Sequence, residues 1–128
     1  MAKEIKRSDA GRYVCQAEEF LAAAKQSLAS GMNNAAAFNA VQAMINANDA
    51  LTIFYLGQRA SADHWEGLKL HADVVKILND GSQRDKLKGA IDLRSHAGYL
   101  GDIISKGDAE KMVRYAVQFI SWVKSNVK

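Results

Sequence analysis

The sequence predicts an all-α fold, an up-and-down bundle of four main helices and one shorter helix. Proline is absent from the 128 residues, so no residue removes a backbone donor inside a helix. Apolar residues recur at helical spacing through most of the chain, and no segment of useful length alternates as a strand would. A hydrophobic content of 48% is enough for one core, so we expect a single domain over residues 1–128.

Capping residues and glycines delimit the expected helices. Ser8 or Asp9 and then Asn33 or Asn34 can cap the first two, and Ser61 the third. The short connection after the first helix predicts an antiparallel hairpin. The expected helices cover about residues 8–30, 33–57, 61–78 and 85–98, with a last helix that begins near 105–108 and carries apolar residues to 127.

The third and fifth of these helices have apolar stripes at helical spacing. The third is expected to bury Trp65, Leu68, Ala72, Val75 and Leu78. The stripe of the fifth consists of Ala109, Met112, Val113, Ala116, Ile120, Val123 and Val127.

The run from Ala36 to Gly57 is apolar on most sides of a helix, yet Asn48 and Asp49 interrupt it. Such a helix must be covered on most sides, which places it at the centre of the bundle or at an interface between bundles. Buried polar side chains cost free energy unless they are hydrogen-bonded, so we expect this pair to have partners.

Composition favours a cytoplasmic protein with no membrane segment. The N-terminus is charged and lacks a signal-like apolar core, and no apolar run approaches the roughly 20 residues of a membrane span. The single cysteine, Cys15, is expected to pack as a small apolar side chain. The formal charge of +3 arises in the second half, where the densest basic cluster is Arg84, Lys86, Lys88 and Arg94. This cluster is either a solvated helix face or a weak contact for RNA.

Neither metal nor cofactor is expected. His64, His71 and His96 show no i, i+4 pair and no HExxH or ExxH spacing. Glycine-rich phosphate loops and a GxSxG elbow are also absent from the sequence.

Two polar segments are candidate sites. At the corner after Gly57, Arg59 and His64 either only build the turn or share a pocket, where arginine would bind a phosphate and neutral imidazole would accept a proton from a 2′-hydroxyl. In the second segment, Arg94 and Tyr99 could meet the buried polar pair, with Asp49 salt-bridged to Arg94. That contact would be a structural bridge or part of a nucleotide or phosphate pocket.

Taken together, these residues resemble the HEPN superfamily, the helical domain found with nucleotidyltransferases and in many toxins and ribonucleases. The resemblance spans about residues 10–127. Its ordered matches to small bacterial members are Asn48-Asp49-Ala50-Leu51, Leu56-Gly57-Gln58-Arg59-Ala60-Ser61, His64, Arg94, Ala97, Tyr99 and Asp108-Ala109. It implies a bundle of four to five helices that commonly forms a homodimer.

The resemblance also implies a test for catalysis. Catalytic HEPN members carry an arginine and a histidine separated by four to six residues, late in the domain near the dimer seam. Here Arg94 and His96 are separated by one residue only. Arg59 and His64 have four residues between them but lie at the earlier corner. No catalytic role is therefore carried over to either pair.

Three interpretations stay open. In the leading one, a homodimeric HEPN-like domain binds a nucleotide, RNA or a partner protein such as a nucleotidyltransferase, without catalysis, through Asn48, Asp49, Arg59, His64, Arg94 and Tyr99. In the second, it is a metal-independent endoribonuclease of the HEPN toxin type. His64 or His96 would then be the general base, and Arg59 or Arg94 would stabilise the phosphorane charge. In the third, the chain is a structural bundle whose polar pair only fixes helix register.

Overall fold

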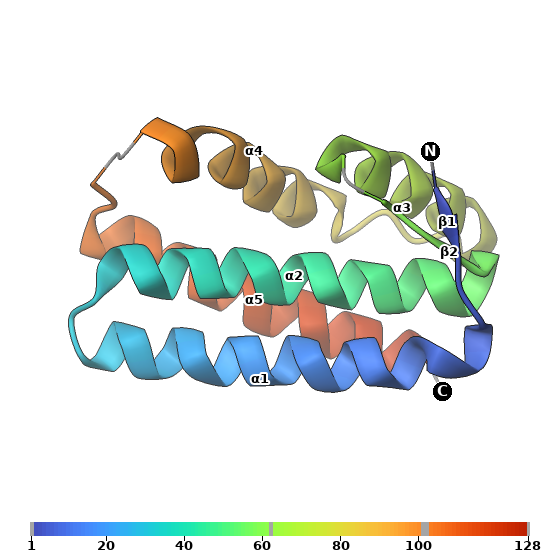
Figure 1. Ribbon diagram of the computed structural model, residues 1–128, viewed down its shortest axis with the longest axis horizontal. Coiled ribbons are helices and arrows are strands. Elements are labelled where there is room, and N and C mark those ends of the chain that lie inside the picture. The colour runs from blue at the N-terminus through green and yellow to red at the C-terminus, as the bar shows by residue number, and fades with distance from the viewer. Residues whose placement is uncertain (1, 62, 101–102, 128) are drawn as a thin grey trace.

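The computed structural model describes residues 2–61, 63–100 and 103–127, with the backbone alone for residues 96–100. Within these ranges the chain forms five helices, which confirms the predicted all-α class (Figure 1). They are α1 Ala10–Ala29, α2 Asn33–Leu56, α3 His64–Leu78, α4 Arg84–Leu100 and α5 Lys106–Asn126. A 3-10 helix at Arg7–Asp9 and two short strands, β1 Lys3–Glu4 and β2 Gln58–Arg59, complete the described elements. None of these helices is both long enough and apolar enough to cross a membrane.

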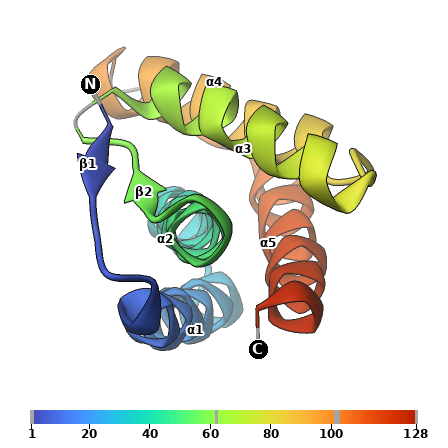
Figure 2. The same cartoon turned by 90° about the vertical axis from the view of Figure 1, so that its right-hand side faces the viewer.

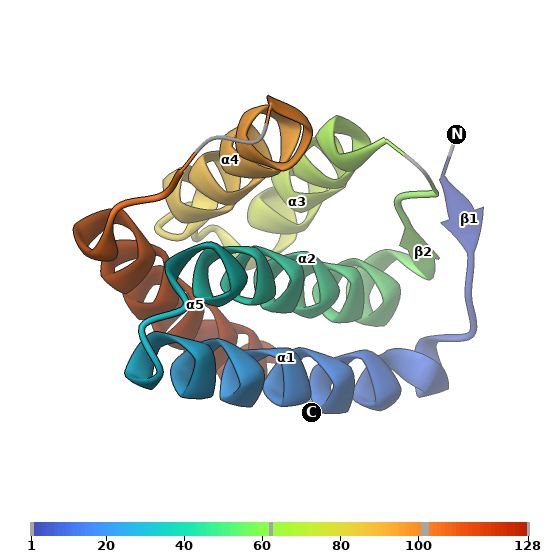
Figure 3. The ribbon, with the colours of Figure 1, turned by 60° about the vertical axis from the view of Figure 1, so that its left-hand side comes forward.

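Helix α2 lies at the centre of the bundle. It runs antiparallel to α1 along its whole length, as the short connection predicted (Figure 1). Seen end-on, α2 is surrounded by α1, α5 and the pair α3 and α4 (Figure 2). Helices α3 and α4 lie side by side over it (Figure 3). The predicted central position of the apolar helix is therefore confirmed within one chain.

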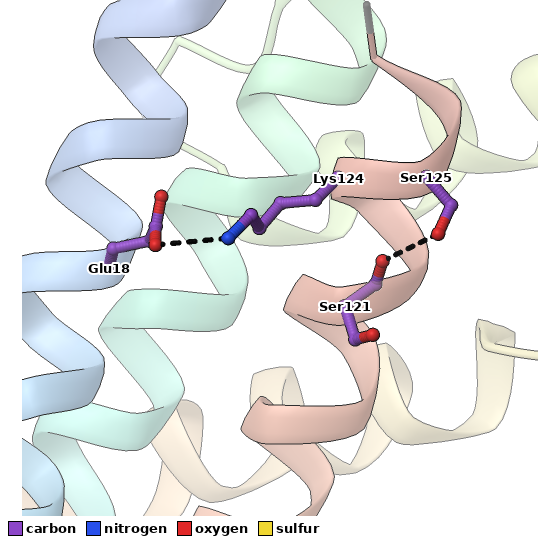
Figure 4. A network of polar contacts seen from close by, with 4 residues as sticks. All are labelled: Glu18, Ser121, Lys124 and Ser125. Carbon is purple, nitrogen blue, oxygen red and sulfur yellow. Dashed lines mark hydrogen bonds and ion pairs between the residues drawn. The ribbon is translucent and has the colours of Figure 1, made fainter.

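Helix α5 closes the bundle against α1 and α2. It buries the apolar stripe predicted for it, except Val127, and adds Phe119. One ion pair crosses to α1, where Lys124 Nζ lies 3.2 Å from Glu18 Oε2, while Ser125 Oγ donates to the carbonyl of Ser121 within α5 (Figure 4). Exposed ion pairs contribute about 0–1 kcal/mol, so the buried stripe supplies most of the attachment.

Several helix starts differ from the predicted caps. Asp9 precedes α1 but makes no side-chain capping bond, and Met32 occupies the cap position of α2. Asn34, expected to cap α2, instead accepts a hydrogen bond from the backbone of Ile104 at 2.9 Å. This long-range bond ties the chain before α5 to the hairpin. Helix α5 begins within the predicted range, and Ser105 caps it by accepting a hydrogen bond from the backbone N–H of Asp108 at 3.1 Å.

Helix α3 is rotated relative to its predicted stripe. It begins at His64 and is capped by Asp63 rather than Ser61. Its buried face consists of Gly67, Leu68, Leu70, His71 and Val74. Trp65, predicted to be buried, is 40% exposed. A hydrogen bond from the Asn48 amide to the carbonyl of Gly67, at 3.0 Å, holds this face of α3 against α2.

Two local features were not predicted. Strands β1 and β2 pair antiparallel, with Lys3 opposite Arg59, and the Ile5 N–H donates to the carbonyl of Gly57 at 3.0 Å. Gly57 makes this reversal with a φ of 70°, a conformation that favours glycine. Cys15 is exposed, so the expectation that it packs inside is wrong.

Asn48 forms a buried hydrogen-bonded connection between α2 and α3. Its Nδ2 donates to the carbonyl of Gly67 at 3.0 Å, and its Oδ1 lies 3.0 Å from Nδ1 of His71. Because the amide nitrogen is the donor to Gly67, Oδ1 must accept from His71, which fixes the imidazole proton on Nδ1. Asn48 thus has the hydrogen-bond partners that its burial required, and both belong to α3.

The His71 ring is held between α2 and α5. Its centroid lies 5.9 Å from that of Phe119 and 5.7 Å from that of Trp122, and Trp122 Nε1 donates to Asp80. Nε2 of His71 is buried without a partner. Burial, with a smaller effect of Arg84 opposed by Asp80, lowers the pKa of His71 to about 4.

We predict that His71 makes stability fall in acid. In the unfolded chain it takes up a proton as the pH drops below its ordinary value of 6.5, whereas the folded protein resists this until about 4. The unfolding free energy therefore loses about 1.4 kcal/mol per pH unit through this group. His71→Asn keeps a donor for Asn48 but cannot titrate. The variant should have a lower free energy of unfolding than the parent protein, and this difference, measured by urea unfolding, should shrink as the pH falls from 6.5 to 4. A difference that stays constant over this range would contradict the prediction.

Candidate functional site

A pocket of about 340 Å³ opens between α1, α2 and the corner that leads into α3. Residues 42, 45, 46 and 49 recur at three- and four-residue spacing, so they share one face of α2 and form its wall. The reversal at Gly57 brings the following segment back over that wall. We call it the α2 pocket, and its lining is Tyr13, Gln16, Gln42, Ile45, Asn46, Asp49, Arg59, Ala60, Ser61 and His64.

Asp49 is the acidic group of the α2 pocket. The residue is only 9% exposed, and its carboxylate has neither a hydrogen bond nor an ion pair among the described residues. Burial raises the pKa of Asp49 from 3.8 to about 7, and the Arg59 charge acts in the opposite direction. The carboxyl group therefore changes charge near neutral pH, which is unusual for an aspartate and common at functional sites.

Arg59 is the basic group of the same pocket. Its Nη1 donates to the carbonyl of Ala60 at 3.0 Å, which fixes the side chain at the end of β2. Its Nε is buried and has no acceptor. Arg59 and Asp49 both face the pocket, yet they form no ion pair in the described part of the chain.

His64, the first residue of α3, lines the pocket as a partly buried imidazole. Burial and then the charge of Arg94 lower its pKa, while Asp63 acts in the opposite direction. Burial and the Arg94 charge therefore favour the neutral ring. A neutral imidazole can accept a proton or a hydrogen bond from a ligand hydroxyl.

Asn46 adds an unpartnered donor to the wall. The residue is 6% exposed, and its Oδ1 accepts a hydrogen bond from Gln42 Nε2 at 3.3 Å. Its Nδ2 is buried without an acceptor. A buried donor left unpaired costs about 1–3 kcal/mol, so a ligand atom that accepts from it would be stabilised.

Sequence-predicted site residues divide into four groups. Asp49, Arg59 and His64 meet in the α2 pocket. Arg94 reaches only its edge, where Nη1 lies 3.5 Å from Gln42 Oε1, so the predicted Asp49–Arg94 salt bridge is wrong. Asn48 faces α3, with both polar atoms of its side chain already hydrogen-bonded. The side chains of His96 and Tyr99, with their predicted roles, lie outside the described residues.

Sequence reasoning missed the pocket residues of α1 and the first half of the α2 wall. Asn46 precedes Asp49 by three residues, and Gln42 precedes Asn46 by four. This polar i, i+4, i+7 series on an apolar helix was the available signal. Tyr13 and Gln16 belong to an ordinary amphipathic helix, and nothing in their spacing distinguishes them. Among the described residues, no group of three His, Cys, Asp or Glu side chains could hold a metal ion.

Comparison with protein families gives one match. The model of the HEPN domain matches residues 10–126, from the first residue of α1 to the last of α5. All the residues that line the α2 pocket fall inside the matched range, whereas β1 lies outside it. No curated protein matches the sequence.

We predict that Asp49 destabilises the fold at neutral and higher pH. Below pH 3.8 it is protonated in both states, whereas between 3.8 and about 7 only the folded protein keeps the proton. Its cost therefore grows as the pH rises through this interval and reaches roughly 4 kcal/mol above it. Asp49→Asn, close in shape to the protonated acid, should raise the unfolding free energy at pH 8 and change it little at pH 4.

Asp73→Asn is the matched control for this measurement, because Asp73 is exposed on α3 and lines no part of the α2 pocket. Equal stability of Asp49→Asn and the parent protein at pH 8, measured by urea unfolding, would contradict the prediction.

Proposed function

The chain belongs to the HEPN domain family, and on that premise we propose that it acts by binding the phosphate group of an RNA segment or a nucleotide in the α2 pocket, without catalysis. The observation that carries this proposal is the Arg59 guanidinium, which faces the pocket while its buried Nε lacks an acceptor. Phosphate is the ligand that fits a fixed, always charged guanidinium best, because its oxygens accept two parallel N–H bonds.

Charge around the pocket supports an anionic ligand. Arg94 lies at the edge, close enough to depress the pKa of His64. Asp49, the one carboxylate among the described lining residues, keeps its proton until about pH 7, so below that pH it offsets little of the charge of Arg59 and Arg94. This balance of charges supports a phosphate as the ligand. Of the ligand contacts named by the leading interpretation from sequence, this proposal keeps Asp49, Arg59, His64 and Arg94. It leaves out Asn48, whose polar atoms are both hydrogen-bonded to α3. The side chain of Tyr99 lies outside the described residues.

Arg59→Ala should weaken RNA binding. Hydrogen bonds to charged groups contribute about 1.5–3 kcal/mol, so the dissociation constant should rise roughly ten- to a hundredfold. We would measure it by fluorescence anisotropy with a short labelled RNA and by competition with inorganic phosphate. Arg59→Lys keeps the charge but loses the paired N–H donors of the guanidinium. Its dissociation constant should therefore lie between those of the parent protein and Arg59→Ala.

The control for this experiment is Arg114→Ala, since Arg114 is exposed on α5 and is not part of the pocket lining. Circular dichroism would show that the variants are folded. If Arg59→Ala and Arg114→Ala bound RNA as the parent protein does, phosphate binding by Arg59 would be refuted.

A second candidate function is metal-independent RNA cleavage. It is favoured by one observation, that His64 and Arg59 line the same pocket with the family's four-residue separation, although at the earlier corner. His64 would take the proton of a 2′-hydroxyl, that oxygen would attack the adjacent phosphorus, and Arg59 would stabilise the charge of the phosphorane. The departing 5′-oxygen would take up a proton, leaving a 2′,3′-cyclic phosphate.

Cleavage would be tested with total RNA in the presence of a chelator. The ribonuclease hypothesis expects chelator-resistant products with 2′,3′-cyclic ends, lost in His64→Gln and in Arg59→Ala. Arg94→Ala, at the edge of the pocket, should reduce the rate less. No cleavage by the folded parent protein would remove this candidate and leave binding alone.

Dimerisation and a partner such as a nucleotidyltransferase, both implied by the resemblance, remain part of the proposal. Sedimentation velocity on the samples used for RNA binding reports self-association directly. The purely structural interpretation is disfavoured because Asp49 has no partner in the described residues, whereas a residue that only fixes helix register would be expected to have one.

A further inference from the structure

Asp49 and Arg59 face one cavity, yet they form no ion pair among the described residues. A carboxylate taken out of water normally pairs with a nearby guanidinium, because each loses part of its hydration. Here Arg59 is fixed by its bond to Ala60, and Asp49 belongs to the central helix. The space between them therefore suits a ligand that presents an acceptor to Arg59 and a donor to Asp49.

A phosphate group alone does not meet both demands. Its oxygens accept from Arg59, but a phosphodiester has no proton to donate and is repelled by an ionised Asp49. A hydroxyl next to the phosphate supplies the missing donor. In an RNA chain the 2′-hydroxyl lies beside the 3′-phosphate, and it is the group by which proteins distinguish RNA from DNA.

Asn46 strengthens this match. It lies one helical turn before Asp49 on the same face of α2, and its buried Nδ2 lacks an acceptor. A hydroxyl both donates and accepts, so one ligand oxygen can donate to Asp49 and accept from Asn46. Phosphate and hydroxyl together would satisfy three groups that lack a partner among the described residues: Arg59 Nε, Asn46 Nδ2 and the Asp49 carboxylate.

We propose that the α2 pocket selects ribose over deoxyribose. Asp49 is the specificity-determining residue, because its carboxylate accepts a hydrogen bond from the 2′-hydroxyl. Asn46 Nδ2 donates a hydrogen bond to the same oxygen. The ligand class is a ribonucleotide unit with a 3′-phosphate, at the end of or within an RNA chain. This inference rests on the proposed phosphate binding by Arg59 and adds the sugar to it.

Three matched oligonucleotides test the inference at pH 8, where Asp49 is ionised: RNA, DNA of the same sequence with uracil in place of thymine, and 2′-fluoro RNA. The 2′-fluoro probe keeps the ribose-like sugar conformation but has no proton to donate. Dissociation constants would be measured by anisotropy in chelator, with each probe checked for intactness afterwards. The parent protein should bind RNA about tenfold more tightly than either analogue, as a charged hydrogen bond implies.

Variants then show which residue is responsible for the preference for RNA. Asp49→Leu, which has a similar volume and no acceptor, should bind all three probes with equal affinity, and Asp49→Asn should keep part of the RNA preference. Arg59→Ala should weaken all three probes by a similar factor and keep their ratio. Asp73→Asn is the control on α3 and should behave as the parent protein.

The outcomes separate the two proposals. Equal binding of RNA, DNA and 2′-fluoro RNA by the parent protein would overturn ribose selection and leave phosphate binding standing. An RNA preference that persists in Asp49→Leu would overturn the role of Asp49. If no probe bound the folded parent protein, both the phosphate proposal and the inference that rests on it would be refuted.

Discussion

The burial of α2 on most of its sides is the constraint on which the rest of the structure depends. Successive residues of a helix project about 100° apart, so Asn48 and Asp49 cannot face the same neighbour. Asn48 meets α3 and forms its two hydrogen bonds there, whereas Asp49 faces the corner and finds none. Of these two neighbouring residues, Asn48 connects α2 to α3, and Asp49 is the unpaired carboxyl group of the α2 pocket.

The fold was largely predictable because helix period, glycine stops and the absence of proline are local signals. The five helices and the α1–α2 hairpin follow from them. The rotation of α3 does not, because Trp65 looks like a core residue until the bond from Asn48 to Gly67 sets which face approaches α2. For the site, Arg59 and His64 were recognisable by type and proximity. The partner expected for Asp49 was wrong because only tertiary packing places Arg94 beside Gln42.

His71 and Asp49 are two buried titratable groups whose pKa values are shifted by the same cause, burial. Both are buried and each favours its neutral form, which lowers the pKa of the histidine and raises that of the aspartate. His71 packs against two aromatic rings of α5 and is bonded to Asn48, so its burial belongs to the architecture. Asp49 borders open space and has no such support. Residues held at a cost to stability, without structural compensation, are expected where a protein functions.

The pairing of β1 with β2 supports one wall of the α2 pocket from outside the range that matches the HEPN domain. Lys3 lies opposite Arg59, and the Ile5 N–H bonds to Gly57, so the first residues brace the backbone that carries the guanidinium. The HEPN match begins only at residue 10. A protein trimmed to that boundary would keep its five helices and lose the support behind Arg59. An affinity tag fused at the amino end would lie next to the same strand. The choice of tag and of first residue should therefore affect how firmly Arg59 is held.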